Sequence, residues 1–481
     1  MRNNRILIYI ISSMLVFSAL CFCTVSAHAN ESTRYIVKVK NNSLKKSVRS
    51  NEGDNTKIFD NIYLTNDIDT FRKSHIVEFY IPDYEAELYD IPYPISTSDT
   101  LIDEQWALTN IKAKESRLVG LTGRNVKIGV VDSGVDFNHR DFNKNNIIDG
   151  RNCIIDQETG EVLDKNDYGD LCGHGTMVTG IIAAQIDNQL GIAGLADNAL
   201  IMPIKVTNGD TLYLSSILLG IKTAIEHKCD IINLSLGGTF KDDPDAINIF
   251  QEIIKEAEDA GIIVIAAVGN SGNTTLNYPA GFEQVIGVGS FDKNNEISWF
   301  SQVNESVFIT APGEDILSLY PDDMYAMDLG TSMSAPIVTA VAALVKEAIP
   351  TCTPAQFRQI LKETAEDIGE EGYDCEYGYG KVNIQNIVNY IKDYIPNVIV
   401  TQGICDSIKQ IYIHNNFSDK IKASAYLASY NDSTKALKNI DIINNFSIDT
   451  GVMNIPYDNN YDCFFLWDNQ MRPYVEKYGF K

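Results

Sequence analysis

The chain has 481 residues, of which 44% are hydrophobic, and a formal net charge of −25. This length predicts more than one domain, and the apolar content is ample for a large core. The acidic balance argues against a nucleic-acid-binding protein, because no basic stripe offsets it.

The first 29 residues have the pattern of a secretory signal peptide. Arg2 and Arg5 precede a long apolar run, and Ala27 and Ala29 form an Ala-x-Ala cleavage site. The run is also long enough for an uncleaved membrane anchor, which is the alternative. No later segment has a comparable apolar run. We therefore expect a mature protein that is secreted or extracellular, or associated with the cell surface.

Residues 30–95 are predicted to form a small unit of their own. The segment RYIVKVK alternates apolar and polar residues, as a strand does, and SHIVEFYIP is predicted as a second strand. A polar stretch separates the two. The following segment, YDIPYPISTSDT, contains the Pro, Ser and Thr residues that indicate an exposed connector.

A larger unit is predicted for residues 96–396. Continuous apolar strands such as VKIGVV and IIVIAAVG alternate with amphipathic helical stretches such as DAINIFQEIIKEAEDAG. This alternation predicts an α/β fold of three layers, a parallel sheet with helices on both faces. Residues 397–481 contain short strand candidates, such as IYIHN and CFFLWDN, and predict a small β-rich C-terminal domain.

Seven of the nine cysteines remain when Cys21 and Cys23 of the signal segment are set aside. Cys229 lies in an apolar strand-like run, which predicts a small buried hydrophobe. No pair has zinc-finger spacing, so a structural metal site of that kind is not expected. One alternative is that all seven thiols are free and packed in the structure. Export also permits disulfides, and the local pairings are Cys153 with Cys172, Cys352 with Cys375, and Cys405 with Cys463.

Three polar residues stand at the ends of predicted elements. Asp132 ends an apolar strand, His174 lies between two glycines at a helix start, and Ser332 opens the helical run IVTAVAALVKEAI. Each has an ordinary explanation, as a turn residue, a structural histidine or a helix N-cap. In an open parallel sheet, however, reactive groups gather at the carboxyl ends of the strands.

Taken together, the stretches VVDSGVD, GHGTMVTG and GTSMSAP are specific. They contain Asp132, His174 and Ser332 in the chain order of the subtilisin-like serine proteases, and the chain resembles that family from about residue 103 to 396. The resemblance implies a subtilisin-like fold and a serine endopeptidase that works through an acyl-enzyme. Ser332 is then the nucleophile, His174 the general base and acid, and Asp132 the group that orients His174.

Asn270, in the stretch VGNSGN, matches the oxyanion-hole residue of the family. The resemblance implies that it acts with the backbone N–H of Ser332 to stabilise the oxyanion. The alternative is a turn asparagine.

The resemblance also implies that an extended peptide binds by strand addition. Leu214 and Ile217 match an apolar subsite, with plain core packing as the alternative. Asn277 falls near the floor of the primary pocket, where a neutral residue does not support a strong demand for a basic side chain. The backbone segments that match the peptide-binding strands are made of Asp210, Thr211, Leu212, Ser235, Leu236 and Gly237.

Asp141 lies nine residues after Asp132, as in family members that bind calcium. The loop IDNQLGIAG resembles their calcium loop but is one residue longer. Calcium prefers oxygen ligands, and a solvated Asp–Asn turn is the alternative. The chemistry itself requires no cofactor. The ligands that the resemblance implies are Asp141, side-chain oxygens of Asp187 or Asn188, and the backbone carbonyls of Leu190 and Ile192.

The unit formed by residues 30–95 resembles the propeptide of secreted family members, a small α+β domain. In the family this unit assists folding and covers the active site as an intramolecular inhibitor until it is cut off. We expect the cut between Ile91 and Gln105, with an uncut or permanently bound unit as the alternative.

The expected partners are peptide or protein substrates of a monomeric enzyme, and nucleic acid is not among them. A rival hypothesis is a non-catalytic peptide-binding protein on a protease scaffold. A second rival, an esterase, favours the motif G-x-S-x-G, whose second glycine GTSMS lacks.

Overall fold

The computed structural model describes the larger unit almost completely and the two flanking units in part. The signal peptide predicted for residues 1–29 lies outside the described residues. These are 35–39, 55–59, 62–65, 77–82, 85–88, 93–95, 101–156, 158–209, 211–240, 243–395, 398–405, 408–415, 421–430, 437–448, 451–457, 463–468 and 473–479.

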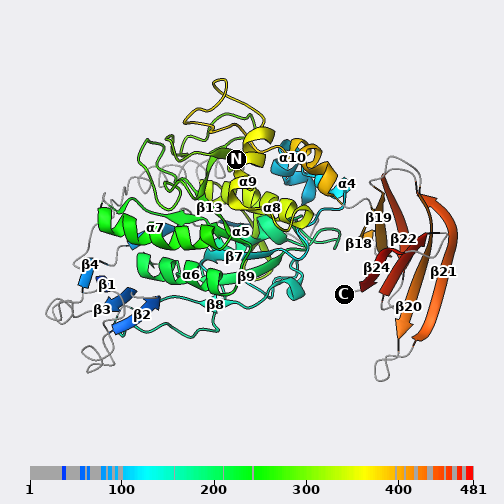
Figure 1. Cartoon of the computed structure of the whole chain (residues 1–481), viewed down its shortest axis with the longest axis horizontal. Coiled ribbons are helices and arrows are strands. Elements are labelled where there is room, and N and C mark those ends of the chain that lie inside the picture. The colour runs from blue at the N-terminus through cyan, green and yellow to red at the C-terminus, as the bar shows by residue number, and fades with distance from the viewer. Residues whose placement is uncertain are drawn as a thin grey trace, which may run out of the picture.

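A seven-stranded parallel sheet forms the centre of the molecule (Figure 1), in the order β15-β14-β13-β11-β7-β9-β8. The parallel sheet predicted from the sequence is therefore confirmed. Its strands are β7 (Lys127–Asp132), β8 (Arg151–Asn152), β9 (Leu200–Lys205), β11 (Ile231–Leu234), β13 (Ile263–Ala267), β14 (Ile286–Phe291) and β15 (Ile309–Pro312).

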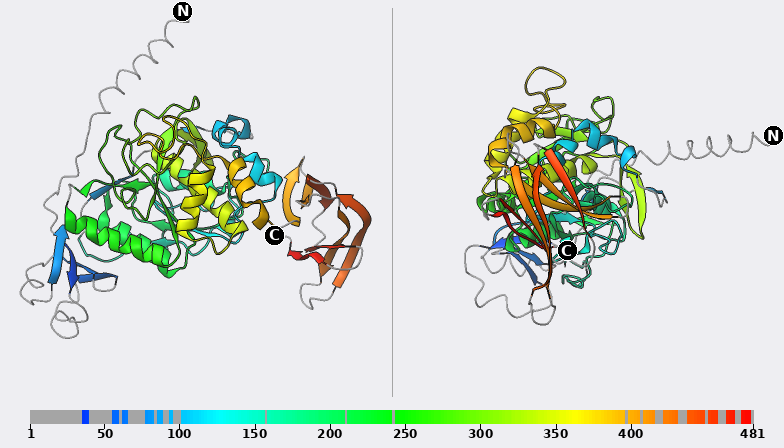
Figure 2. Two further views of the ribbon diagram at one scale, coloured as in Figure 1. Left: turned by 45° about the horizontal axis from the view of Figure 1, so that its top comes forward. Right: turned by 90° about the vertical axis from the view of Figure 1, so that its right-hand side faces the viewer.

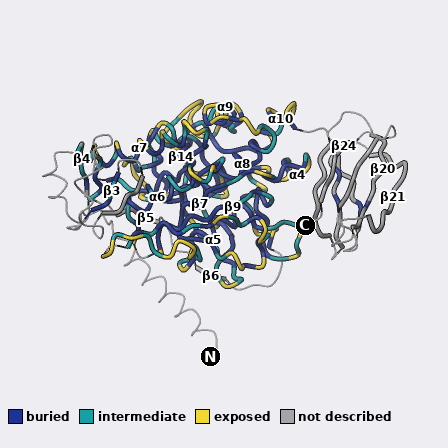
Figure 3. The backbone as a smooth tube through the Cα atoms, turned by 60° about the horizontal axis from the view of Figure 1, so that its bottom comes forward, coloured by how far each residue is buried: buried dark blue, intermediate teal, exposed yellow. Residues whose placement is uncertain are grey.

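Both faces of this sheet are apolar, because its side chains alternate between two buried clusters. Ile263 and Ile265 of β13 belong to the cluster under α5 (His174–Ala183) and α8 (Thr331–Ala348), whereas Val264 belongs to the cluster under α6 (Leu214–Glu226) and α7 (Pro244–Asp259). A strand buried on both faces is apolar throughout, as these strands are. Figure 3 shows the buried backbone concentrated in these layers. The other helices are η2 (Ile102–Glu104), α3 (Trp106–Asn110), α4 (Lys114–Leu118), η3 (Lys144–Asn146), α9 (Pro354–Thr364), α10 (Ile384–Ile391) and η5 (Lys392–Tyr394).

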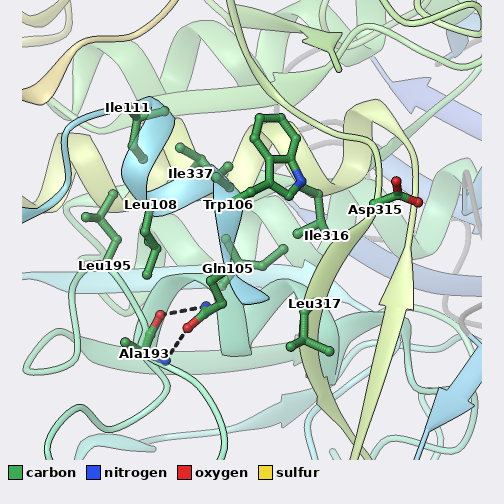
Figure 4. Close-up of a pocket in the computed structure, with 12 residues that line it drawn as sticks. Gln105, Trp106, Leu108, Ile111, Ala193, Leu195, Asp315, Ile316, Leu317 and Ile337 are labelled. Atoms are coloured by element: carbon green, nitrogen blue, oxygen red, sulfur yellow. Dashed lines mark hydrogen bonds between the residues drawn. The ribbon is translucent and has the colours of Figure 1, made fainter. Parts of the chain in front are cut away.

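The start of this unit is fixed to the core by Gln105 and Trp106. The Gln105 amide accepts a hydrogen bond from the N–H of Ala193 at 2.7 Å and donates one to its carbonyl at 3.0 Å (Figure 4). The Trp106 indole donates to the carbonyl of Glu314 at 3.1 Å. A small cavity beside these contacts is lined mainly by apolar side chains, among them Leu108.

A four-stranded antiparallel sheet of the N-terminal unit lies beside α6 and α7 (Figure 1). Ile36 and Leu64 are buried in the same cluster as the apolar face of α7, and Lys38 forms an ion pair with Glu252 of that helix. The sheet has the order β2-β3-β1-β4 and consists of β1 (Tyr35–Val39), β2 (Asn55–Phe59), β3 (Ile62–Thr65) and β4 (Val77–Pro82).

Two short strands after this sheet join the larger unit. Strand β5 (Glu85–Leu88) lies between β10 (Leu212–Tyr213) and β12 (Leu236–Gly237), antiparallel to both. Strand β6 (Tyr93–Ile95) then pairs with β17, the second strand of a hairpin. The hairpin consists of β16 (Ile316–Tyr320) and β17 (Met324–Asp328).

The described residues beyond 397 all lie in antiparallel strands at one end of the molecule (Figures 1 and 2). They form two sheets, with the orders β18-β19-β22 and β21-β20-β23-β24. Their strands are β18 (Val398–Cys405), β19 (Ile408–Asn415), β20 (Ile421–Tyr430), β21 (Leu437–Ile448), β22 (Gly451–Tyr457), β23 (Cys463–Asp468) and β24 (Pro473–Gly479).

Two of the suggested disulfides are wrong, because all four cysteines concerned are free thiols. Cys153 is buried beside the hydroxyl of Thr223, at 3.3 Å, and burial raises its pKa to about 11. Cys352 is buried while Cys375 is exposed. Cys229 is buried, as predicted. The side chains of the third pair, Cys405 and Cys463, lie outside the described residues.

The two-faced sheet makes a prediction about stability. Replacing Ile265, which is fully buried in β13, with Ala leaves a cavity in the core. We expect the free energy of unfolding to fall by about 2–5 kcal/mol in urea denaturation. Ile102, which is 42% exposed, is the control, and Ile102→Ala should change it by less than about 0.5 kcal/mol. Equal losses in the two variants would contradict the assignment of Ile265 to the core.

Candidate active site

Asp132 ends β7, an inner strand of the sheet, and its carboxylate is fully buried. One oxygen, Oδ1, lies 2.7 Å from Nδ1 of His174 and accepts a hydrogen bond from the backbone N–H of Ser133, also at 2.7 Å. A buried carboxylate without such partners is strongly destabilising. The contact occupies Nδ1 of His174 and directs Nε2, on the other side of the ring, away from Asp132.

The glycines that flank His174 have a steric role. Gly173 takes a φ of +94°, which favours glycine, at the position before α5 begins. A Cβ atom on Gly175 would lie 2.1 Å from the carbonyl oxygen of Gly134 and 3.1 Å from Asp132 Oδ1. Only glycine lets the first turn of α5 come this close to the end of β7.

Asp170 holds the start of α5, a role that the sequence analysis missed. Its Oδ1 accepts hydrogen bonds from the Ser133 hydroxyl at 2.9 Å and from the N–H of Gly173 at 2.9 Å, and its Oδ2 accepts from the N–H and hydroxyl of Thr176. Ser133 in turn accepts from the N–H of Gly175 at 2.9 Å. An acidic residue four positions before a predicted helix start was the signal available.

Ser332 is the second residue of α8 and is fully buried. Helices α5 and α8 pack against each other, and the charge of His174 acts on Asp328, four residues before Ser332. The start of α8 therefore lies near the start of α5, which His174 occupies.

Pro336 explains a further contact of Ser332. Pro336 lies in the second turn of α8, not in the first, and has no N–H to donate to the carbonyl four residues before it. That carbonyl belongs to Ser332, and it accepts a hydrogen bond from the Ser235 hydroxyl at 2.9 Å. The proline thus frees a backbone oxygen that ties Ser332 to the segment before β12.

Asn270 follows β13 and contacts the residue before Ser332. Its Oδ1 accepts hydrogen bonds from the N–H of Thr331 at 2.9 Å and from the Thr331 hydroxyl at 2.8 Å. These two donors fix the orientation of the amide, so its NH2 group is turned away from Thr331. Thr331 was not singled out in the sequence, because a threonine at a helix start is common.

The backbone segments expected to bind peptide lie on either side of β5. Leu212 pairs with Ala86, Leu236 with Leu88, and Gly237 with Glu87, all in antiparallel register. Ser235 directly precedes β12, and the exposed Thr211 precedes β10, whereas Asp210 lies outside the described residues.

The other expected substrate residues are buried. Leu214 and Ile217 are fully buried in the cluster beneath α6 and α7, where they pack in the core. Asn277 is 5% exposed and donates a hydrogen bond to the carbonyl of Val268 at 3.0 Å. A Cβ atom on Gly269 would lie 2.0 Å from Nδ2 of Asn277, so this amide lies directly against the backbone before Asn270.

Comparison with known proteins agrees with this geometry. The model of the Subtilase family matches residues 123–380, which contain Asp132, His174 and Ser332. The chain belongs to the subtilase family. It is therefore a serine endopeptidase, a hydrolase of peptide bonds.

Individual relatives support the same assignment. Subtilisin NAT of Bacillus subtilis subsp. natto is 33% identical over 410 residues, which cover 80% of this subtilase and 99% of the relative. Minor extracellular protease Epr of Bacillus subtilis is 36% identical over 291 residues, covering 60% and 42%. Major intracellular serine protease of Bacillus subtilis is 41% identical over 243 residues, covering 49% and 73%. The similarity to Subtilisin NAT extends well beyond the part matched by the family model.

The loop expected to bind calcium in this subtilase is arranged around the fully buried Asp141. Its carboxylate accepts hydrogen bonds from Asn188 Nδ2 at 2.7 Å, the N–H of Ile192 at 3.0 Å and the Tyr325 hydroxyl at 3.2 Å. Burial raises the pKa of Asp141 to about 7, and the three donors act in the opposite direction.

These contacts do not fit a calcium ion. Asn188 Oδ1 accepts from the N–H of Leu190 at 2.8 Å, so the amide turns its NH2 group toward Asp141. Ile192 offers Asp141 its N–H and not its carbonyl. Asp187 does not join the cluster through any hydrogen bond that the described residues make with Asp141. Calcium requires six to eight oxygen ligands. The Asp141 carboxylate is instead surrounded by N–H and O–H groups that donate hydrogen bonds to it.

The packing of Gly175 makes a prediction about activity. In Gly175→Ala the added methyl group pushes α5 away from Asp132. We expect kcat/KM to fall at least a hundredfold, because a displacement of about 1 Å at reacting groups has an effect of this size. Gly169→Ala is the matched control, since its added Cβ would lie 3.5 Å from Asp167 Oδ1, an ordinary contact. A folded Gly175→Ala enzyme with more than a tenth of the wild-type kcat/KM would contradict the steric argument.

The Asp141 cluster makes a prediction about calcium. Tyr325→Phe removes one donor and should lower the free energy of unfolding by about 1–3 kcal/mol. Calorimetry should give the same Tm for the wild type in calcium and in EDTA. Tyr320→Phe, which removes a long 3.5 Å hydrogen bond to a backbone carbonyl, is the control and should have a smaller effect. A calcium-dependent rise in Tm that Asp141→Asn abolishes would overturn this view of the loop.

Proposed function

We propose that this chain is a secreted serine endopeptidase, made as a zymogen, whose catalytic triad is Asp132, His174 and Ser332. The observation that carries the proposal is the 2.7 Å contact between Asp132 and His174, next to the helix start that holds Ser332. Two residues from different elements meet there with the chemistry and burial that the triad requires.

The proposed reaction follows from the positions of the three groups. His174 takes the proton of the Ser332 hydroxyl as the oxygen attacks a peptide carbonyl, and it then gives this proton to the leaving amine. Asp132 holds the imidazole and stabilises its protonated form. Water then attacks the acyl-enzyme on Ser332. His174 takes a proton from this water and gives it to the departing Ser332 oxygen.

The oxyanion of the intermediate receives two proposed donors. One is the NH2 group of Asn270, which Thr331 turns away from itself by binding Oδ1. The other is the backbone N–H of Ser332 in the first turn of α8, where N–H groups have no acceptor within the helix. The positive end of the α8 dipole lies at the same place and favours the developing negative charge.

The position of β5 supports the proposal that residues 30–95 act as an intramolecular inhibitor. This strand fills the gap between β10 and β12, where an extended substrate would add by the same backbone pairing. The apolar contacts of the N-terminal sheet with α6 and α7 hold the strand in place.

The two short strands also narrow the expected cleavage point. Strand β5 ends at Leu88 on one side of the site, and β6 begins at Tyr93 on β17, whose end leads to Ser332. We therefore propose a cut between Leu88 and Tyr93, which only partly overlaps the range from Ile91 to Gln105 expected from the sequence.

Secretion rests on the sequence of the first 29 residues. None of the helices in the described residues has the length and apolar character needed to cross a bilayer. One relative is called extracellular and another intracellular. We propose that the mature enzyme acts outside the cell, because an N-terminal signal pattern precedes the inhibitor unit, and that it is a monomer, as subtilisin-like proteases generally are.

A serine-directed fluorophosphonate tests the nucleophile. The wild type should become labelled after maturation, and Edman sequencing of the mature form should start between residues 89 and 93. Ser332→Ala should stay uncut and unlabelled, with turnover reduced roughly a million-fold. Ser334→Ala is the control on the same helix, since its hydroxyl donates to backbone carbonyls of Ala311 and Pro312.

Two outcomes count against the proposal. Labelling of Ser332→Ala as strong as that of the wild type would reject the nucleophile assignment. A correctly matured wild type that neither reacts with the probe nor cuts peptides would favour the non-catalytic binding protein.

A further inference from the structure

Asp328 is a buried carboxylate close to the site, and the proposed mechanism assigns it no role. It is the last residue of β17 and is 9% exposed in the uncut chain. Its Oδ1 accepts a hydrogen bond from the N–H of Leu329 at 2.8 Å. Its Oδ2 is buried and accepts no hydrogen bond from the described part of the chain. A buried carboxylate oxygen without a partner is unfavourable, so Asp328 is suited to receive one.

The charged group that acts on Asp328 is the imidazole of His174, the proposed catalytic histidine. Burial raises the pKa of Asp328, and the His174 imidazole acts in the opposite direction. Asp328 also ends β17 four residues before Ser332, which places it at the end of the strand nearest to the proposed nucleophile.

Strand β17 is the edge on which we expect the second half of a bound polypeptide to add. It already pairs with β6, in the register Tyr325 with Ile95, Ala326 with Pro94 and Met327 with Tyr93. Since β5 precedes β6 in the chain and lies on the other side of the site, the part of a substrate on β17 follows the cleaved bond. Asp328 is the next residue of β17 toward Ser332.

We propose that Asp328 makes this endopeptidase prefer substrates with Lys or Arg on the leaving-group side of the cleaved bond. The inference rests on the proposed function. An ammonium or guanidinium group reaching Oδ2 forms a charge-assisted hydrogen bond in a partly water-excluded site. Glu or Asp at the same substrate position meets a like charge and is disfavoured.

The net charge of −25 must be separated from this local effect, because an acidic surface attracts cationic peptides in general. Asp323 offers a matched control. It lies in the same β16–β17 hairpin, carries the same charge and forms an ion pair with Arg140. Asp323→Asn removes one negative charge at the turn of the hairpin and leaves Asp328 in place.

The test measures kcat/KM for two sets of fluorogenic peptides. One set varies the first residue after the cleaved bond and the other set varies the second. The varied residue is Lys, Arg, Met or Glu. The matured wild type and Asp323→Asn should both cut the Lys and Arg peptides about tenfold faster than the Met peptide. Asp328→Asn, which keeps the shape of the side chain, should reduce this ratio to near one. Fluorophosphonate labelling of Asp328→Asn verifies that the variant is folded and its nucleophile reactive.

Each other outcome has a defined meaning. A Lys-to-Met ratio near one in the wild type overturns the inference, and so does a ratio that Asp328→Asn leaves unchanged. A ratio lowered equally by Asp323→Asn and Asp328→Asn assigns the preference to the general field and also overturns it. Absence of both cleavage and labelling in the wild type instead contradicts the proposed function.

Discussion

The hydrogen bond between Asp132 and His174 is the constraint on which the rest of the site depends. It requires the end of β7 and the first turn of α5 to approach more closely than side chains with a Cβ atom permit. Gly175 removes that atom on the helix, whereas a Cβ on Gly134, at a φ of +106°, would meet the carbonyl oxygen of Tyr168. Asp170 and Ser133 then satisfy the donors exposed at the helix start. The glycines that flank His174 are thus explained by packing, independently of the chemistry of the histidine.

The sheet and the helix α8 extend this constraint to the nucleophile. All seven strands are parallel, so Asp132, Ser235 and Asn270 follow strands that end at the same edge. Helix α8 is buried from Thr331 to Lys346, which explains its run of small and apolar residues. Because Ser332 opens a helix packed on all sides, its position is set by the core and not by a mobile loop.

The sequence was sufficient for those features that depend on local patterns. Continuous apolar strands predicted the parallel sheet, and the glycines around His174 predicted a helix start. The contact of Asp141 with Tyr325 could not be predicted from the sequence, because 184 residues separate the two and neither lies in an unusual local pattern. The same holds for the pairing of Leu88 with Leu236. The cysteine pairings failed for another reason, since an oxidising compartment permits disulfides but does not bring thiols together.

The burial of the proposed triad connects folding with the proposed regulation. Asp132, His174 and Ser332 are fully buried in the chain as it is synthesised, with its own strand β5 between the strands that would bind a substrate. Backbone pairing depends little on side chains, so in the proposed zymogen the same two strands accept first the inhibitor segment and then a substrate. In the proposed maturation, removal of the segment therefore exposes an already formed site and requires no rearrangement of the sheet. Selectivity must then come from side chains that border the two strand edges, and among the described residues Asp328 is the charged one that ends β17 beside His174.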